Sequence, residues 1–184
     1  MKFLPTELPG VVIVEPDVHR DARGFFLETW SAPKYAAGGI DAIFVQDNHS
    51  RSARGTLRGL HAQTPRAQAK LLRASFGEIY DVAVDIRHGS PTFGKWIGVV
   101  LSAENARQLY IPEGFAHGFC VLSETADLAY KCTDVYVPGD EITVRWDDPA
   151  IGVQWPIAEP LLSTRDAGAK TLAELADRLP RFAG

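Results

Sequence analysis

Residues Ile79–Ile86 (IYDVAVDI) carry the strongest indication of the fold class. β-Branched and aromatic side chains dominate this stretch, and such residues favour strands. Successive side chains of a strand point to opposite faces. One face therefore carries Tyr80, Val82, Val84 and Ile86, and the other carries Asp81, Ala83 and Asp85. Two carboxylates on one face fit the solvated side of a β-sandwich, and they fit a functional site equally well.

Similar runs recur along the whole chain between glycine and proline signals. We predict further strands at Val11–Val14, Phe25–Trp30, Ile43–Gln46, Leu71–Phe76, Trp96–Leu101, Gln108–Ile111, Phe115–Leu122, Ala126–Val137 and Thr143–Trp146. Helical signals are few. Ser31 and Pro33 predict a short helix that ends before Gly38-Gly39, and the spacing of Leu172, Leu175 and Leu179 predicts a C-terminal helix. The chain is therefore expected to be all-β, a sandwich or a jelly roll with short peripheral helices.

Composition and charge narrow the class of protein. The 184 residues are 46% hydrophobic, and 16 glycines and 12 prolines are spread evenly, which favours one domain over residues 1–184. A formal net charge of −4 argues against a nucleic-acid-binding protein, which needs a basic face. Between Arg51 and Arg73, however, every charged residue is basic. This segment suits a small anionic ligand.

The start of the chain and its cysteines indicate the compartment. MKFLPTELPG lacks the apolar core of a signal peptide, and no stretch approaches the roughly 20 apolar residues of a membrane helix. Cys120 and Cys132 lack CxxC spacing, so we expect buried free thiols. The sequence predicts a cytoplasmic protein that binds no membrane.

Two histidines follow signals that place them in strands. His61 comes three residues after Arg58 and nine before Lys70, and histidine exchanges protons near neutral pH. Ile111–His117 has a Pro-x-Gly-x-x-His pattern, which delivers His117 into the next strand and resembles the second motif of cupins, the double-stranded β-helix proteins. A histidine among apolar neighbours is otherwise usually a hydrogen-bonded core residue.

Many cupins bind a metal through that histidine, but the first cupin motif argues against it here. Metal cupins usually supply two histidines and a carboxylate from the first motif, whereas this chain has His61 followed by Gln63. Arg58 and Lys70 would also repel a dication. We therefore expect no metal, and a metal-dependent cupin enzyme is the least favoured alternative.

A longer series of motifs, spread from about residue 3 to about residue 170, resembles the dTDP-4-dehydrorhamnose 3,5-epimerase family of cupin-type enzymes. The motifs are Asp21–Glu28, Phe44–Ser50, Leu57–His61, Gly77–Arg87, Ser90–Gly94, Leu101–Asn105, Tyr110–Phe119 and Tyr130–Thr133. The resemblance implies a cupin jelly roll and a nucleotide-linked 4-keto-6-deoxyhexose substrate without a cofactor. It also implies a homodimer in which an N-terminal segment reaches the partner.

The resemblance implies roles for four residues in proton transfer next to the C4 ketone. His61 would be the base, oriented by Asp166, and Tyr130 would be the acid. Lys70 would offset the negative charge of the enolate. Without the resemblance, Tyr130 would be interpreted as a cross-strand packing residue.

The resemblance also implies a set of binding residues. The substrate-binding residues are expected to be Arg23, Phe26, Glu28, Gln46, Asn48, Arg58, Lys70, Asp81, His117, Phe119 and Arg165. Arginine forks suit a diphosphate, although any of these arginines could equally be a solvated surface charge. Regular alternation puts Arg58 and His61 on opposite strand faces, so we hypothesise a bulge at Gly59 that brings both into one site.

Some positions depart from the family pattern and leave alternatives open. His19-Arg20 stands where relatives commonly have an aromatic-glycine pair, and Val135 stands where they often have an aromatic residue, so the nucleotide base is less certain than the chemistry. A single-site 3- or 5-epimerase and a non-catalytic nucleotide-sugar-binding cupin also remain. Retention of His61, Asp166, Lys70 and Tyr130 together favours catalysis, because a binder needs neither a base nor an acid.

Overall fold

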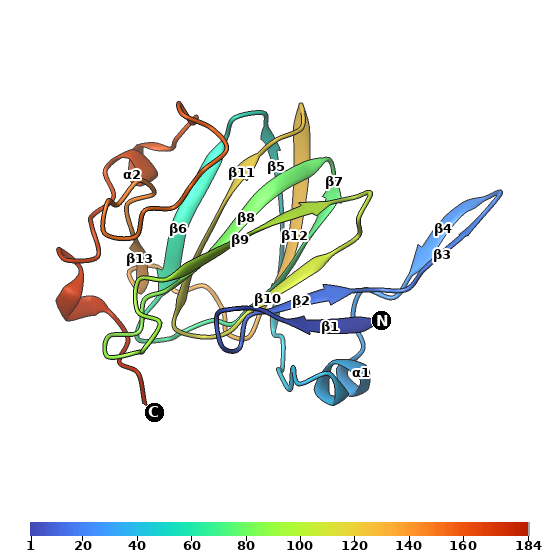
Figure 1. The fold of residues 1–184 in the computed structure, drawn as a ribbon, viewed down its shortest axis with the longest axis horizontal. Coiled ribbons are helices and arrows are strands. Elements are labelled where there is room, and N and C mark those ends of the chain that lie inside the picture. The colour runs from blue at the N-terminus through green and yellow to red at the C-terminus, as the bar shows by residue number, and fades with distance from the viewer. Residues whose placement is uncertain (184) are drawn as a thin grey trace.

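Two antiparallel β-sheets face each other in this protein, whose computed structural model describes residues 1–183 (Figure 1). The elements are β1 Lys2–Pro5, β2 Val12–Glu15, β3 Val18–Asp21, β4 Gly24–Leu27, α1 Ala32–Ala37, β5 Gln46–Ala53, β6 Leu57–Gln63, β7 Lys70–Phe76, β8 Glu78–Asp85, β9 Trp96–Ser102, β10 Gln108–Ile111, β11 Phe115–Val121, β12 Thr125–Cys132, β13 Glu141–Thr143, α2 Thr164–Ala167 and a 3₁₀ helix Ala176–Arg178.

Strand order identifies the architecture. One sheet has six strands in the order β1-β2-β10-β7-β12-β5, and the other has five in the order β13-β6-β11-β8-β9. Strands that are neighbours in space are mostly distant in sequence, as in a jelly roll, where the chain crosses repeatedly between the sheets. The predicted all-β, cupin-type jelly roll with short peripheral helices is confirmed.

Both faces of the five-stranded sheet are covered. On the inner face Ile79, Ala83 and Phe115 pack in the core between the sheets. On the outer face Val82 and Val84 pack in a second apolar cluster that the C-terminal segment completes. Because each fully buried aliphatic side chain stabilises a fold by roughly 1.5–3 kcal/mol, this double cover holds the central strands β8 and β11 rigidly in place.

The two carboxylates of β8 lie on the inner face and are completely buried. Asp85 accepts hydrogen bonds from Ser90 Oγ at 2.6 Å and Thr92 Oγ1 at 2.7 Å, and it pairs with Arg87. Asp81 lies 2.9 Å from His117 Nε2. The solvated-face interpretation is therefore wrong, because this side of the sheet faces the second sheet instead of water.

Several predicted strands need correction. The predicted strand Ile43–Gln46 is irregular, with Ile43 81% exposed, and the true strand β5 starts at Gln46. β12 ends at Cys132 instead of running to Val137, and β13 ends at Thr143 instead of Trp146. β5 escaped notice because its inward side chains are polar, so it lacks the apolar alternation that indicates a half-buried strand.

The two predicted helices fare differently. α1 is confirmed, with Pro33 in its first turn and the Gly38 amide bonded to the carbonyls of Lys34 and Tyr35. The C-terminal helix is wrong, since residues 172–179 form turns and the short 3₁₀ helix. Leu172, Leu175 and Leu179 are buried nevertheless, because this segment packs against the outer face of the five-stranded sheet. Their spacing therefore indicates burial and not a helix.

Three further features matter for the site. The β3–β4 hairpin projects away from the barrel, at the upper right of Figure 1. Cys120 and Cys132 are free and buried, as predicted. Among the described residues, none of the helices has both the length and the apolar character needed to cross a membrane.

Candidate active site

A pocket of about 360 Å³ opens between the two sheets, a volume suited to a small ligand. Its lining comes from β5, β6, β7, β11, β12, β13 and α2. The lining residues are Gln46, Asn48, Ser50, Arg58, His61, Gln68, Lys70, His117, Phe119, Leu128, Tyr130, Cys132, Tyr136, Glu141 and Arg165. Nine of the predicted site residues therefore meet in one cavity.

A bulge at Gly59 brings Arg58 and His61 to the same face. On β11, Phe119 lies opposite Arg58 and His117 lies opposite His61, so two residues of β6 oppose the single residue Gly118. Gly59 has φ +124°, and a Cβ there would lie 2.5 Å from Gly118 Cα. The hypothesised bulge is confirmed, and only glycine fits at its centre.

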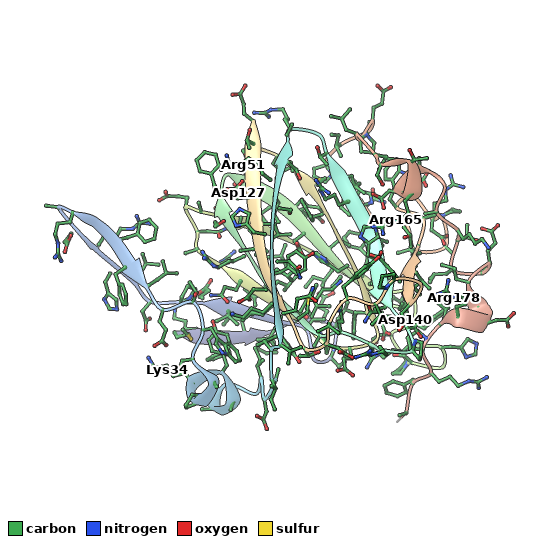
Figure 2. The ribbon with its side chains drawn as sticks, turned by 180° about the vertical axis from the view of Figure 1, so that it is seen from behind. Lys34, Arg51, Asp127, Asp140, Arg165 and Arg178 are labelled. Carbon is green, nitrogen blue, oxygen red and sulfur yellow. The ribbon has the colours of Figure 1, made fainter. Side chains whose placement is uncertain are left out.

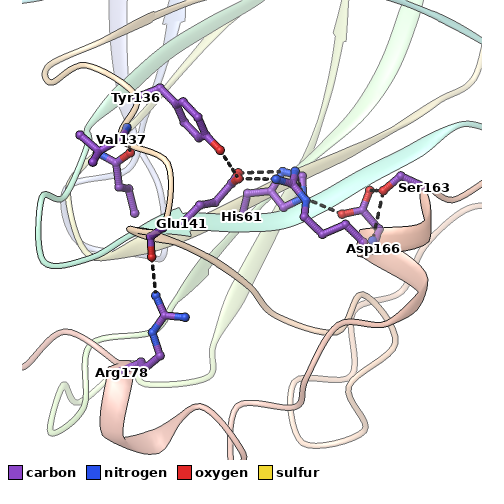
Figure 3. Close-up of polar contacts among 10 residues, drawn as sticks. His61, Tyr136, Val137, Glu141, Ser163, Asp166 and Arg178 are labelled. Atoms are coloured by element: carbon purple, nitrogen blue, oxygen red, sulfur yellow. Dashed lines mark hydrogen bonds and ion pairs between the residues drawn. The ribbon is translucent and has the colours of Figure 1, made fainter.

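His61 is held by a buried carboxylate (Figure 3). Its Nε2 lies 2.6 Å from Asp166 Oδ1, and Ser163 Oγ donates to Asp166 Oδ2 at 2.8 Å. Ser163 also caps α2 by accepting the Asp166 amide at 3.1 Å. Burial raises the pKa of Asp166, but the hydrogen bonds and charges of His61, Ser163 and Arg165 outweigh it, so the pKa lies below its usual value. Asp166 is thus an anion at neutral pH.

The negative charge of Asp166 determines which ring nitrogen of His61 can act as a base. An ionised carboxylate only accepts hydrogen bonds, so Nε2 of a neutral His61 carries the proton that bonds Asp166. The lone pair then resides on Nδ1, which lies 3.8 Å from Glu141 Oε1. Nδ1 is therefore the nitrogen that is able to take a proton.

Lys70 supplies a positive charge to the pocket. It stands at the start of β7, opposite Cys132 of β12. Burial lowers its pKa, and the nearby Cys132, Glu141 and Asp81 partly restore it. Within residues 1–183 no hydrogen bond or ion pair engages its ammonium group, so this group can bind an oxygen of a ligand.

Tyr130 lines the same pocket from β12. Burial raises the pKa of its phenol, and the electrostatic effects of Cys132 and Glu141 raise it further, against an opposing effect of Arg58. The phenol therefore keeps its proton at neutral pH and can donate it.

His117 and Asp81 form a second histidine-carboxylate pair deeper in the barrel. Burial lowers the pKa of His117, while the charge and hydrogen bond of Asp81 act in the opposite direction. His117 lines the pocket, and Asp81 supports it from the neighbouring strand β8. A buried, paired histidine of this kind donates or accepts one hydrogen bond in a fixed direction.

The remaining predicted residues divide into two groups. Gln46, Asn48 and Phe119 line the pocket, and Arg58 Nε donates to Ser52 Oγ at 3.0 Å beside it. Arg165 also lines it, with Nη2 at 3.1 Å from His61 Nε2.

The other group, on or just after the β3–β4 hairpin, lies outside the pocket. Arg23 pairs with Asp21 of the same hairpin, Phe26 is 71% exposed, and Glu28 lies 3.0 Å from Lys34. Figure 2 shows Arg165 on the opposite side of the barrel from the hairpin. One chain alone therefore does not bring Arg23, Phe26 or Glu28 to the cavity.

The structure adds residues that sequence reasoning missed. Glu141, Tyr136, Gln68 and Ser50 line the pocket, and Ser163 orients Asp166. Ser163 could have been found, because Ser-x-x-Asp is a capping pattern that opens a helix. The others have no local signal: they lie on the unrecognised polar strand β5, in the β6–β7 and β12–β13 loops, and on the short edge strand β13.

Gln63, which stands where metal cupins supply a second histidine, is fully engaged. Its amide donates to Arg66 O at 2.7 Å and Val135 O at 3.1 Å, and it accepts from Val137 N at 2.8 Å. Across the described part of the chain, no three His, Cys, Asp or Glu residues gather as metal ligands would. Gln63 thus ties the β6–β7 loop to the β12–β13 loop.

Fold and site together define a jelly roll with an acid–base pocket lined by cations. The family model described as dTDP-4-dehydrorhamnose 3,5-epimerase matches residues 5–174. The chain belongs to this family.

Three similar proteins illustrate the match. The dTDP-4-dehydrorhamnose 3,5-epimerase of Pseudomonas aeruginosa is 53% identical over 182 residues, covering 98% of this chain and 100% of the relative. The protein of the same name from Neisseria gonorrhoeae is 52% identical over 99% of this chain, which spans 56% of that relative's length. A crystal structure of dTDP-6-deoxy-D-glucose-3,5-epimerase from Legionella pneumophila, in complex with dTDP-4-keto-L-rhamnose, has a TM-score of 0.96, 50% identity and coverage of 100% and 99%.

Proposed function

We propose that this protein converts dTDP-4-dehydro-6-deoxy-D-glucose into dTDP-4-dehydro-L-rhamnose by inverting C3 and C5. The observation that carries the proposal is that His61, held from behind by Asp166, lines the same pocket as Tyr130. A base and a protonated phenol in one cavity are what inversion at carbon needs, since one group removes a proton and another returns it to the opposite face. Family membership supplies the substrate class.

The proposed reaction begins with proton removal at a carbon beside the C4 ketone. Nδ1 of His61 takes the proton, and the electrons of the C–H bond move onto the ketone oxygen to give an enolate. Asp166 stabilises the resulting imidazolium through Nε2. Lys70 offsets the charge on the oxygen, an electrostatic effect that is usually the largest contribution to such a step.

The second half-reaction returns a proton from the other side of the ring. The Tyr130 hydroxyl donates to the carbon, the enolate electrons re-form the C–H bond and the ketone, and solvent restores both side chains. No redox cofactor is required, because proton removal and return leave the oxidation state unchanged. The positioned acid and base together contribute roughly 10²–10⁴-fold to such a rate.

Binding of the substrate is assigned to the polar and cationic lining. Arg58, His117 and Phe119 would contact the sugar, with Asp81 behind His117, while Gln46, Asn48 and Arg165 would bind the nucleotide and its diphosphate. The guanidinium fork of Arg165 suits phosphate oxygens.

A homodimer belongs to the same proposal, because Arg23, Phe26 and Glu28 lie outside the pocket of their own chain. The projecting hairpin supports this idea, since it is free to extend towards a second copy (Figure 1). Size-exclusion chromatography with light scattering tests the dimer. A cytoplasmic location is supported by the two free cysteines and is tested by fractionation.

Two alternatives compete with this function. A single-site epimerase would use the same base on one carbon only, and a non-catalytic cupin would bind the nucleotide sugar without exchanging protons. The His61–Asp166 pair disfavours mere binding, because burial of the Asp166 carboxylate costs desolvation that a binder gains nothing from.

The test is incubation of the protein with dTDP-4-dehydro-6-deoxy-D-glucose in D₂O, followed by mass spectrometry and NMR. Two incorporated deuterons, at C3 and C5, with the L-rhamno configuration are expected. One deuteron would establish the single-site alternative, and none would reject the proposal.

A further inference from the structure

Glu141 is an unexpected residue for a pocket that receives an anion. Among residues 1–183 it is the one carboxylate in the pocket lining, where Arg58, Lys70 and Arg165 supply positive charge. A dTDP-linked sugar carries a diphosphate, so an added negative charge weakens its binding. Attraction of the diphosphate therefore does not explain why Glu141 lies in this pocket.

The contacts of Glu141 point to the base and its surroundings (Figure 3). Oε1 lies 3.8 Å from His61 Nδ1, Oε2 pairs with Arg165 Nη1, and the Tyr136 hydroxyl donates to Oε2 at 3.4 Å. Its strand β13 pairs with β6, with Thr143 opposite His61. Glu141 is thus fixed beside the imidazole by its own backbone and by two side chains.

Arg165 places a positive charge next to His61, and Glu141 is the carboxylate that pairs with it. Nη2 of Arg165 lies 3.1 Å from His61 Nε2. A guanidinium has only hydrogen-bond donors, so it cannot accept the proton that Nε2 carries. When His61 takes a proton from the sugar, an imidazolium forms directly beside this second cation. Repulsion between the two raises the energy of the intermediate unless a carboxylate neutralises the guanidinium.

We propose that Glu141 is a charge-balancing positioning residue: it neutralises Arg165 and faces Nδ1 of His61, so that the imidazolium can form next to a guanidinium. His61 then stands between two carboxylates, Asp166 at Nε2 and Glu141 at the Nδ1 side. Arg165 stays available for the diphosphate without opposing the base. This inference rests on the proposed function.

The proposal predicts a separation of kcat from KM. Glu141→Gln keeps the size of the side chain and removes its charge. We expect kcat at saturating substrate to fall about 10- to 100-fold, less than for loss of a fully buried electrostatic contact because the site is partly exposed. KM is expected to stay equal or to fall, since one repulsive charge has gone. Glu141→Asp, which retains the charge, should keep most of the activity.

A double variant separates charge balance from simple support of Arg165. Arg165→Gln alone should raise KM and lower kcat only about 3-fold or less. In Glu141→Gln/Arg165→Gln the unbalanced cation is absent, so kcat should recover to within about 5-fold of the Arg165→Gln value. A merely structural role of Glu141 would instead make the double variant at least as slow as Glu141→Gln.

The decisive experiment measures kcat, KM and deuterium incorporation for the wild type and these four variants, with thermal unfolding as a check on folding. Recovery in the double variant supports the proposal. Wild-type kcat in Glu141→Gln, or a double variant no faster than Glu141→Gln, overturns it while leaving the epimerase function intact. If the wild type itself incorporates no deuterium, the proposed function fails and this inference falls with it.

Discussion

The barrel pocket and the β3–β4 hairpin were both expected to contact the substrate, but they are built differently. In the pocket, His61 is fixed by Asp166, and Asp166 by Ser163, all within hydrogen-bonding distance. On the hairpin, Phe26 is largely exposed and Arg23 pairs with Asp21 of its own turn. The residues of the proposed proton transfer therefore all come from one chain, whereas the proposed nucleotide contacts of the hairpin would require a second copy.

Removal of the base should have the largest effect. His61→Asn retains a polar side chain of similar reach but cannot take a proton, so we expect deuterium incorporation to fall at least about 10³-fold. Mass spectrometry of the substrate recovered from D₂O measures it. Unchanged incorporation would exclude His61 as the base and would remove the distinction between pocket and hairpin.

Loss of the orienting carboxylate should come next. Asp166→Asn can place its amide NH₂ against Nε2, which favours the tautomer with its proton on Nδ1, so kcat should fall about 10²–10⁴-fold. KM should change little, because Asp166 does not line the pocket between the sheets. Steady-state kinetics check this. A rise in KM at constant kcat would make Asp166 a binding residue instead.

Changes in the hairpin should act on binding alone. Arg23→Ala and Phe26→Ala should each raise KM about 5- to 10-fold with kcat within about 2-fold, because they would contact the nucleotide far from the reacting carbons. Arg145→Ala is the matched control, since Arg145 also pairs with an aspartate two residues away on the surface. Equal KM values in all three variants would rule out a role for the hairpin.

An ion pair on the barrel exterior provides the smallest effect. Arg51 and Asp127 pair on β5 and β12 (Figure 2), and the hydrogen bond from Arg51 is the main reason that the pKa of Asp127 falls to about 2. A lowered folded-state pKa stabilises the protein above the unfolded value near 4, and this contribution disappears as the pH falls through about 2.

The free energy of unfolding of the wild type should therefore decrease between about pH 4 and pH 2. Arg51→Ala should reduce that slope, and its difference from the wild type should vanish near pH 2. Urea denaturation at several pH values measures both. Parallel curves for the two proteins across this range would show that the pair contributes nothing, as is common for surface ion pairs.

Sequence patterns predicted the strands with apolar interiors well. The predicted bounds of β8 and β10 agree with the structure to within a residue or two, because their apolar side chains pack in the hydrophobic core. β5 was misplaced because its inward residues Gln46, Asn48 and Ser50 line a polar pocket. The pattern therefore fails where the strand serves the ligand, since there the usual link between burial and hydrophobicity is broken.

The site shows the same limit. Motif resemblance found His61, Lys70 and Tyr130, and elementary strand geometry required a bulge at Gly59, which the register of β6 and β11 confirms. Glu141 could not be foreseen, because its place beside His61 depends on the pairing of a three-residue edge strand. Contacts that arise only from distant pairing leave no signal in local sequence.

The central claim is that one imidazole and one phenol, on different strands of the same pocket, divide proton removal and proton return between them. Tyr130→Phe in D₂O tests it most directly, with incorporation and configuration both followed by NMR. The account predicts that deuterium still enters the substrate from the His61 side while inversion falls at least about 10²-fold. Inversion at the wild-type rate in this variant would contradict it.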